Sequence, residues 1–467
     1  MVAAGALLSA STVDAAEPAK STADQQTGVE VTVYNSNLGL VKDVREIQLP
    51  EGEGELQFMD VASAIIPETV HVRSVNHPQD FQLLEQNYEY DLISPEKLLE
   101  KYVGKTIKLL TWNQYQDRKE VVEATLLSMN NGPVYRINGE IHLGNEGRPI
   151  LPELPENLFA RPTLSWQYRN QNRSQHRIEA SYLTNKITWK ADYVLTLNAE
   201  DTAADLAGWV TLDNRSGATY RDARLKLVAG SIHRALEREE GDSYRAQRMA
   251  EVASDQAQFQ EQGLFEYHLY DLQRPTTVKD NQTKQISLLE ASGVGVKKEL
   301  LVYGLDAYYT SQYREDNPKQ PVVVYVSVKN SKENRLGMPL PEGIVRTYKQ
   351  DAAGSLQFIG EDRIQHTPKD EELRLKIGEA FDVVAERRQT DFRQLTVHQY
   401  ESEWEILVKN HKEQDVTVGL IEPVPGSWTV VSSSQSYTKK DASTIRFDVP
   451  VPKNGETKVT YRIRVGI

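Results

Sequence analysis

GWVTLDNRSGATY, residues 208–220, indicates the fold class because it joins one strand to a polar turn and to the start of another strand. Apolar and polar residues alternate as far as Leu212, which is typical of a strand with one buried face. A polar group follows at 213–216, where Asn214 is suited to cap a turn through its amide. We therefore interpret this group as a turn, not a catalytic loop, and expect Asn214 at a strand end with Trp209 and Leu212 on opposite faces.

Two later stretches repeat this sequence pattern. VVVYVSVKNSKENRLG at 322–337 and SEWEILVKNHKEQDVT at 402–417 each contain a period-two strand that ends in a charged residue and an asparagine, followed by polar turn residues. Asn330 and Asn410 occupy the position of Asn214. Short strands of this kind, bounded by turn residues, indicate immunoglobulin-like β-sandwich units.

We expect a mainly β protein with several domains, because 467 residues exceed the usual size of one domain. Residues 94–104 are the one short helix expected, with Ser94 as N-cap and Gly104 beyond its end. A polar insertion at 235–263, rich in Glu, Gln and Ala, is expected to be part helical and part disordered. The expected domains are an N-terminal β domain at 28–93, a small SH3-like barrel at 94–155, a β-sandwich at 156–330 that carries the insertion, and a C-terminal β-sandwich at 331–467.

The composition limits the possible partners and compartment. The formal net charge of −13 opposes binding to nucleic acid and to anionic lipid. There is no cysteine, and no apolar run is long enough for a transmembrane helix. Residues 1–16 read as a signal-like segment, with small residues before a cleavage-like step at 13–15. We therefore expect a periplasmic or secreted protein without a transmembrane segment.

The search for chemistry finds no strong constellation. The nine histidines have neither HxH nor HExxH spacing, and no G-x-S-x-G, P-loop or GxGxxG motif occurs. No catalytic, cofactor-binding or metal-binding residue is predicted, and no cofactor. Four tyrosines gather in VYGLDAYYTSQY, a segment that resembles a loop, where exposed rings could stack on a sugar or a protein; the alternative is packing within a sandwich. These candidate ligand-binding residues are Tyr303, Tyr308, Tyr309 and Tyr313.

A family resemblance covers most of the chain. ASYLTNKITWKADYVLTL, followed by LAGWVTLDNRSGATYRDARLKLVAG, resembles the mucoidy-inhibitor-like exported proteins of bacteria, a family of unknown function. VTVYNSNLGLVKDVREIQLPEGEGELQFMDV and the stretch from 340 to 384 resemble the same family. The better-known branch has a long coiled coil after its N-terminal β region, whereas KLLEKYVGKTIKLL leads here into a small β module. The resemblance implies membership but no activity, cofactor or catalytic residue.

Together these observations favour an exported, envelope-associated protein that binds or scaffolds a protein or polysaccharide without catalysis. The alternative is a hydrolase of envelope glycans or peptides, with a site assembled from residues distant in sequence. A site of convergent His or carboxylate groups in a cleft would favour the hydrolase.

Overall fold

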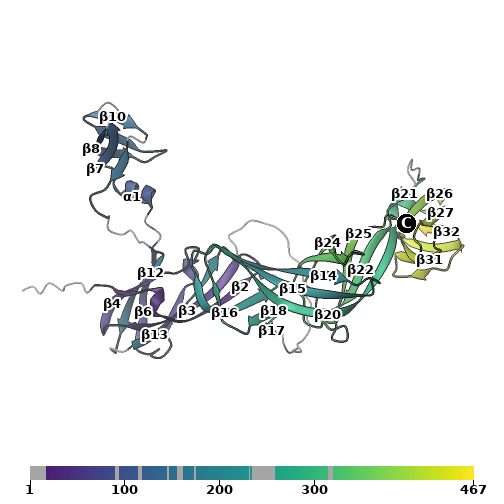
Figure 1. Ribbon diagram of the computed structural model, residues 1–467, viewed down its shortest axis with the longest axis horizontal. Helices are drawn as coiled ribbons and strands as arrows, with labels where there is room; N and C mark the ends of the chain where they lie inside the picture. The colour runs from purple at the N-terminus through teal and green to yellow at the C-terminus, as the bar shows by residue number, and fades with distance from the viewer. Residues whose placement is uncertain are drawn as a thin grey trace, which may run out of the picture. The chain divides into compact units, whose positions relative to one another are not determined.

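A computed structural model shows a mainly β protein (Figure 1). It describes residues 17–89, 94–113, 118–144, 147–154, 161–172, 175–230, 232–233, 258–313 and 319–467. The signal-like segment at 1–16 and residues 235–257 of the expected insertion lie outside the described residues. Within the described part the strands form five sheets, beside one α-helix and three 3₁₀ turns at Ala23–Gln25, Pro67–Thr69 and Asp306–Tyr309. None of the described helices is both long and apolar enough to cross a membrane.

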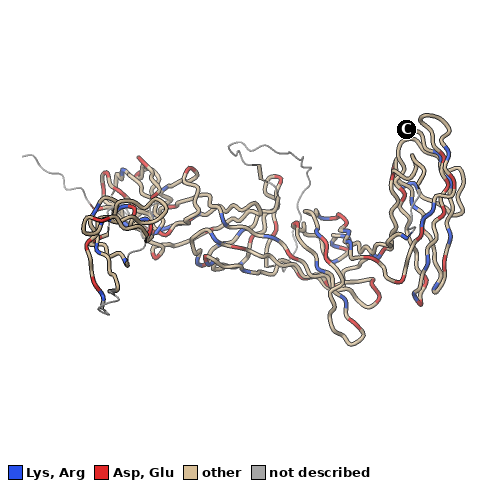
Figure 2. Tube along the Cα trace, turned by 90° about the horizontal axis from the view of Figure 1, so that it is seen from above, with Lys and Arg blue, Asp and Glu red and all other residues tan. Residues whose placement is uncertain are grey.

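The contacts between residues divide the chain into two compact units. The first unit holds Met1–Thr188, Asp213–Lys226 and Pro275–Gln282, and the second holds Trp189–Leu212, Leu227–Arg274 and Thr283–Ile467. Lys and Arg are interspersed with Asp and Glu along the strands of both (Figure 2). The five boundaries fall within or between strands, so each unit is built from segments that are distant in sequence.

Two sheets of the first unit are built around the N-terminal strands. One has the order β1-β4-β12-β6, formed by Ala19–Ser21, Gly52–Met59, Thr163–Asn170 and Phe81–Glu89. The other contains the order β16-β2-β3-β13-β5, formed by Tyr220–Ala229, Gln26–Tyr34, Leu38–Gln48, Gln175–Asn185 and His71–Ser74, with β19 (Thr276–Val278) paired to β16. Strands β12 and β13 therefore pair with N-terminal strands, whereas the sequence placed them in the sandwich at 156–330. Strand β12 lies between β4 and β6 and pairs with both.

The small module at 94–154 has its own sheet and core. Helix α1 (Pro95–Lys101) begins where the Ser94 hydroxyl accepts a hydrogen bond from the Lys97 N–H, as expected from its N-cap pattern. The sheet has the order β10-β9-β8-β7-β11, formed by Glu140–Leu143, Val134–Ile137, Arg118–Ser128, Thr106–Asn113 and Arg148–Ile150. Its buried side chains are Tyr102, Ile107, Leu109, Ala124, Leu126, Tyr135 and Ile137.

The long sheet of the second unit has the order β24-β23-β14-β15-β20-β28-β31-β30. These strands are Leu356–Ile364, Gly343–Gln350, Ile187–Leu197, Ala203–Asn214, Gln282–Tyr303, Val416–Pro423, Thr444–Val451 and Thr438–Lys439. Strand β22 (Val323–Lys329) extends this sheet by pairing with β20 and β25 (Glu372–Glu379). Strand β17 (Phe259–Leu264) pairs with β18 (Tyr267–Leu272), and both belong to the sheet of β16. Residues 259–263 are thus a strand, which corrects the expectation that the insertion extends to 263, because Phe259 is buried and anchors the hairpin.

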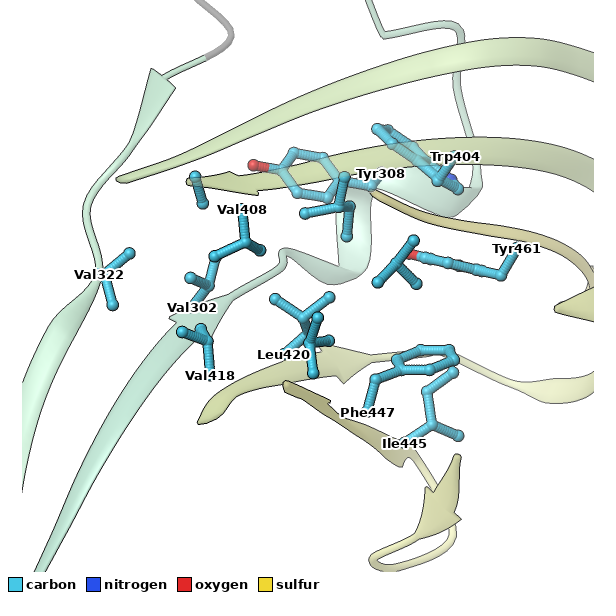
Figure 3. Close-up of a cluster of buried hydrophobic side chains, with 14 of the residues drawn as sticks. Val302, Tyr308, Val322, Trp404, Val408, Val418, Leu420, Ile445, Phe447 and Tyr461 are labelled. Carbon is cyan, nitrogen blue, oxygen red and sulfur yellow. The ribbon is translucent and has the colours of Figure 1, made fainter. Parts of the chain in front are cut away.

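A two-layer sandwich closes the C-terminal part of the second unit. Its second sheet has the order β21-β26-β27-β32-β29, formed by Lys319–Gln320, Val383–Thr396, Gln399–Asn410, Gly455–Gly466 and Ser427–Ser433. Alternate residues of β27 and β32 face those of β28 and β31, and together they bury one core that includes Trp404, Leu420, Phe447 and Tyr461 (Figure 3). This packing follows from the period-two pattern because alternate side chains point to one side of a strand.

The opening stretch adopts the predicted form. Asn214 is the last residue of β15, Leu212 is fully buried, and Trp209 is 37% exposed. Since β15 alternates buried and exposed residues along this part, Trp209 and Leu212 lie on opposite faces. The prediction for the strand end is confirmed.

Candidate functional site

The four candidate tyrosines do not form one exposed platform. Tyr308 and Tyr309 lie in the 3₁₀ turn Asp306–Tyr309 and are 4% and 0% exposed. Tyr313 is half-buried against Trp404, whereas Tyr303 ends β20 and is 38% exposed. The exposure that stacking on a ligand needs is therefore absent at Tyr308 and Tyr309, whose rings pack into the sandwich core instead. Figure 3 shows Tyr308 in this core.

Tyr309 belongs to a buried polar network centred on Arg387 and Glu422. Arg387 Nη1 donates to Glu422 Oε2 at 3.0 Å, and both side chains are fully buried. The Tyr309 hydroxyl donates to the same Oε2 at 2.7 Å, so it accepts the hydrogen bond from the Tyr461 hydroxyl at 2.9 Å. Gly304 makes room for this carboxylate, because a Cβ there would lie 2.2 Å from Glu422 Oε2.

The electrostatics of the network match its burial. Burial raises the pKa of the Tyr309 and Tyr461 hydroxyls well above the usual value for tyrosine, so both stay protonated. Burial alone would lower the pKa of Arg387, but the charge and hydrogen bond of Glu422, together with the Tyr461 and Tyr309 hydroxyls, outweigh it and raise that pKa. The network is thus a closed ion pair with satisfied hydrogen bonds, and it presents no group to solvent.

The sequence carried a signal for this pair that we did not use. Val383 and Ala385 of β26 are buried, and Arg387 continues their period-two phase. Glu422 likewise follows Leu420 in β28. Two opposite charges in the buried phase of two strands indicate a pair within the core, because an unpaired buried charge is strongly unfavourable.

The strand-end asparagines form the second set of buried polar groups. Asn410 is fully buried at the end of β27. Its amide donates to the Gln414 carbonyl at 2.9 Å and to the Pro452 carbonyl at 3.1 Å, and its Oδ1 accepts from the Lys412 N–H at 3.0 Å. One side chain therefore closes its own turn and holds it to the segment after a neighbouring strand.

Three other asparagines repeat this arrangement. Asn214 donates to the Ala218 and Lys279 carbonyls, and Asn330 donates to the Met338 and Pro368 carbonyls. A fourth, Asn170 at the end of β12, donates to Leu49 and Pro50 and was missed by the sequence analysis. The signal was present, since YRN at 168–170 has a charged residue before its asparagine, as do DN at 213–214 and KN at 329–330 and 409–410. Burial of all four at 0–1% exposure identifies them as structural, which confirms the turn interpretation.

Asn170 also takes part in a serine–histidine–asparagine chain. The His176 Nε2 lies 3.1 Å from Asn170 Oδ1, and its Nδ1 lies 3.0 Å from the Ser74 hydroxyl. Because the Asn170 amide nitrogen is committed to two carbonyls, Oδ1 faces the ring, so Nε2 carries the proton and Nδ1 accepts from Ser74. The geometry is that of a nucleophile and base, but Ser74 and His176 are 2% and 0% exposed. The chain therefore joins β5, β12 and β13 rather than reaching a substrate.

The burial of His176 predicts a pH-dependent stability. Burial lowers the pKa of His176 below its ordinary value of 6.5, with His77 and Asp80 as its charged neighbours. Below about pH 6.5 the unfolded chain therefore binds more protons than the folded chain, and stability falls as the pH falls. We expect the melting temperature of the first unit to decrease between about pH 7 and pH 5.

His176→Gln should reduce this pH slope, measured by thermal unfolding followed by circular dichroism. The matched control is His71→Gln, which removes an exposed histidine from neighbouring strand β5. An identical slope in the wild type and in His176→Gln would show that His176 is not the titrating group.

Exposed apolar side chains concentrate on one face of the five-stranded sheet of the small module, here called the outer face. The opposite face carries the buried core, so residues one position along each strand point outward. Leu110 pairs with Val121, and Trp112 pairs with Lys119 across β7 and β8. The large apolar residues that are at least 42% exposed on this face are Trp112, Val121, Ile141, Leu143 and Ile150.

The outer face is also basic. Lys108, Lys119, Arg136 and Arg148 are exposed on it, and the one acidic residue described there is Glu123, opposite Lys108. Four positive charges against one negative charge leave three in excess, on a chain whose net charge is −13. Within the described part of the chain, none of the four basic residues forms an ion pair. The outer face thus combines exposed apolar side chains with positive charge. Neither is part of the buried core of the module.

Comparison with known protein families shows the family of this chain. A family model described as a domain of unknown function (DUF4139) matches residues 178–466, which is more than half of the chain. The chain belongs to this family. The DUF4139 match includes Asn214, Asn330, Asn410 and the Arg387–Glu422 pair, but not the outer face. A search of the curated proteins finds no match. Among the described residues of this DUF4139 protein, no group of three His, Cys, Asp or Glu side chains is placed to hold a metal ion.

Proposed function

We propose that this DUF4139 protein is a non-enzymatic binding or scaffold protein of the bacterial envelope, of the mucoidy-inhibitor-like type, exported to the periplasm or beyond. One observation carries the proposal: the outer face gathers exposed apolar side chains and basic side chains that form no ion pair with any described residue, whereas the polar clusters built from distant residues are sealed inside the sheets. Apolar area that a fold leaves exposed in one patch is typical of an interaction surface. The outer face is therefore the proposed contact surface for an envelope component.

The hydrolase alternative has one observation in its favour, the Ser74–His176–Asn170 chain. A catalytic serine must reach the scissile carbonyl of its substrate, and Ser74 is 2% exposed. The Ser74 hydroxyl also lies 3.2 Å from Asn76 Oδ1 and 3.3 Å from the His77 N–H, so backbone and side chains surround it. The binding proposal therefore has the stronger support.

The test compares the wild type with Leu143→Ser in pull-downs from native envelope extract and on a glycan array. Leu143 is 73% exposed, so we expect the variant to fold normally and to lose most of the captured partner. Val397→Ser is the matched control, because Val397 is 74% exposed in another part of the chain. Equal capture by all three proteins would contradict the proposed surface, and hydrolysis of an envelope substrate that Ser74→Ala abolishes would favour the alternative.

A further inference from the structure

We infer that the outer face docks on a lipid bilayer surface that carries anionic headgroups. The inference rests on the proposed function, since it names the partner of the same surface. It starts from the mixture of side chains: aliphatic residues and one tryptophan protrude, and lysines and arginines stand among them. Side chains of these two kinds bind together at a bilayer interface, where apolar groups enter the acyl boundary and cations pair with phosphates.

The arrangement along the strands supports a flat contact. Across β7 and β8 the outward pairs are Lys108 with Glu123, Leu110 with Val121 and Trp112 with Lys119. Arg148 lies directly across from Leu110, on strand β11. Each apolar side chain of this row therefore has a cation beside it. At the depth of the headgroups, a bilayer can contact the apolar side chains and pair with the cations at the same time. Trp112 at the end of the row is suited to that depth, because its ring is apolar and its N–H is polar.

The other edge of the sheet has the same composition. Ile141 lies directly across from Arg136, and Leu143 lies across from Val134. Leu143 is 73% exposed and Ile141 is 54% exposed, so these side chains stand out from the sheet. A fluid bilayer accepts protruding side chains without a matching cavity, whereas a protein partner needs complementary shape. A polysaccharide would use aromatic rings to stack on its sugars, and the described outer face offers only Trp112.

The net charge of the chain does not exclude this contact. A total of −13 opposes approach to an anionic surface at long range. Salt screens exposed charges beyond about 8 Å at physiological ionic strength, so at contact the local excess of three positive charges dominates. Each of these cations near an anionic membrane strengthens binding by about 1 kcal/mol, or about fivefold.

The test measures cosedimentation of the full chain with vesicles of phosphatidylcholine alone and of equal parts phosphatidylcholine and phosphatidylglycerol. We expect binding to the anionic vesicles that high salt weakens, and little binding to the neutral ones. Lys119→Gln with Arg148→Gln should weaken binding about 25-fold. Arg388→Gln with Lys440→Gln changes the net charge equally at two exposed sites elsewhere and should have little effect.

A second readout locates the contact. Lipids with brominated acyl chains should quench tryptophan fluorescence in the wild type, and Trp112→Phe should lose that quenching while it still binds. Two results would overturn the inference: no binding to anionic vesicles, or equal binding by both double variants. If vesicles fail but Leu143→Ser still loses a protein or glycan partner, the lipid assignment is wrong and the binding function stands; if both assays fail, both proposals are wrong.

Discussion

Arg387→Met is expected to lower the free energy of unfolding of the C-terminal sandwich by about 3–5 kcal/mol. The substitution keeps an apolar stem of similar length but leaves the Glu422 carboxylate buried without its cation. Tyr309 still donates to that carboxylate, but one hydrogen bond does not compensate a buried charge. The measurement is thermal unfolding together with amide hydrogen exchange in β26, β27 and β28, since a chain with two units need not unfold in one step.

The neighbouring residue supplies the control for this prediction. Arg388→Met removes the same charge from an exposed position one residue along β26, and we expect a change within about 0.5 kcal/mol. Adding Glu422→Gln to Arg387→Met should restore part of the loss, because the glutamine is neutral and its amide oxygen still accepts from Tyr309. Similar losses for Arg387→Met and Arg388→Met would show that the buried pair does not hold the sandwich together.

The sequence predicted the fold class and the turns because these depend on local pattern. Asn214 and Asn410 each end a period-two strand and Asn330 directly follows one, and a short amide at that position has few other roles. Ser94 likewise predicted the start of the one helix. The pairing of the strands was harder to predict. From the sequence, β12 belongs to the sandwich that follows it, yet in the structure it pairs with β4 and β6. A period-two pattern fixes which face is buried, not which strand lies alongside.

The candidate site could be predicted only in part, because burial of the tyrosines depends on strands far along the chain. The Tyr309 hydroxyl donates to Glu422, which lies 113 residues away in the sequence, and no residue near Tyr309 in the sequence indicates this contact. Tyr308 and Tyr309 follow a strand in a segment of polar and small residues, which resembles an exposed loop. The outer face was missed for a different reason: Trp112 and Val121 fit a strand with either face buried, and only the core formed by Ile107 and Leu109 settles the phase.

Asn410→Asp is expected to destabilise the same sandwich by about 3 kcal/mol at neutral pH. The carboxylate keeps the acceptor for the Lys412 N–H but cannot donate to the Gln414 and Pro452 carbonyls. Those carbonyls would then face a negative oxygen in a position that is 0% exposed. The stability lost should exceed the loss from replacing an ordinary strand-end cap, because the Asn410 amide holds two segments of the chain together.

The pH dependence of Asn410→Asp separates repulsion from a simple loss of hydrogen bonds. Burial and the facing carbonyls would raise the pKa of the introduced carboxyl above about 3.9, its usual value. The folded variant then binds more protons than the unfolded one, so its stability falls as the pH rises above about 4, opposite to the effect of His176.

Asn454→Asp is the matched control, since Asn454 is exposed in the same sandwich and aspartate tolerates its φ of 48°. Chemical unfolding of both variants across this pH range would measure the difference. If the stability lost in Asn410→Asp does not grow as the pH rises, the introduced carboxylate must reach water. The turn would then open when the amide is missing, instead of staying against the neighbouring strand.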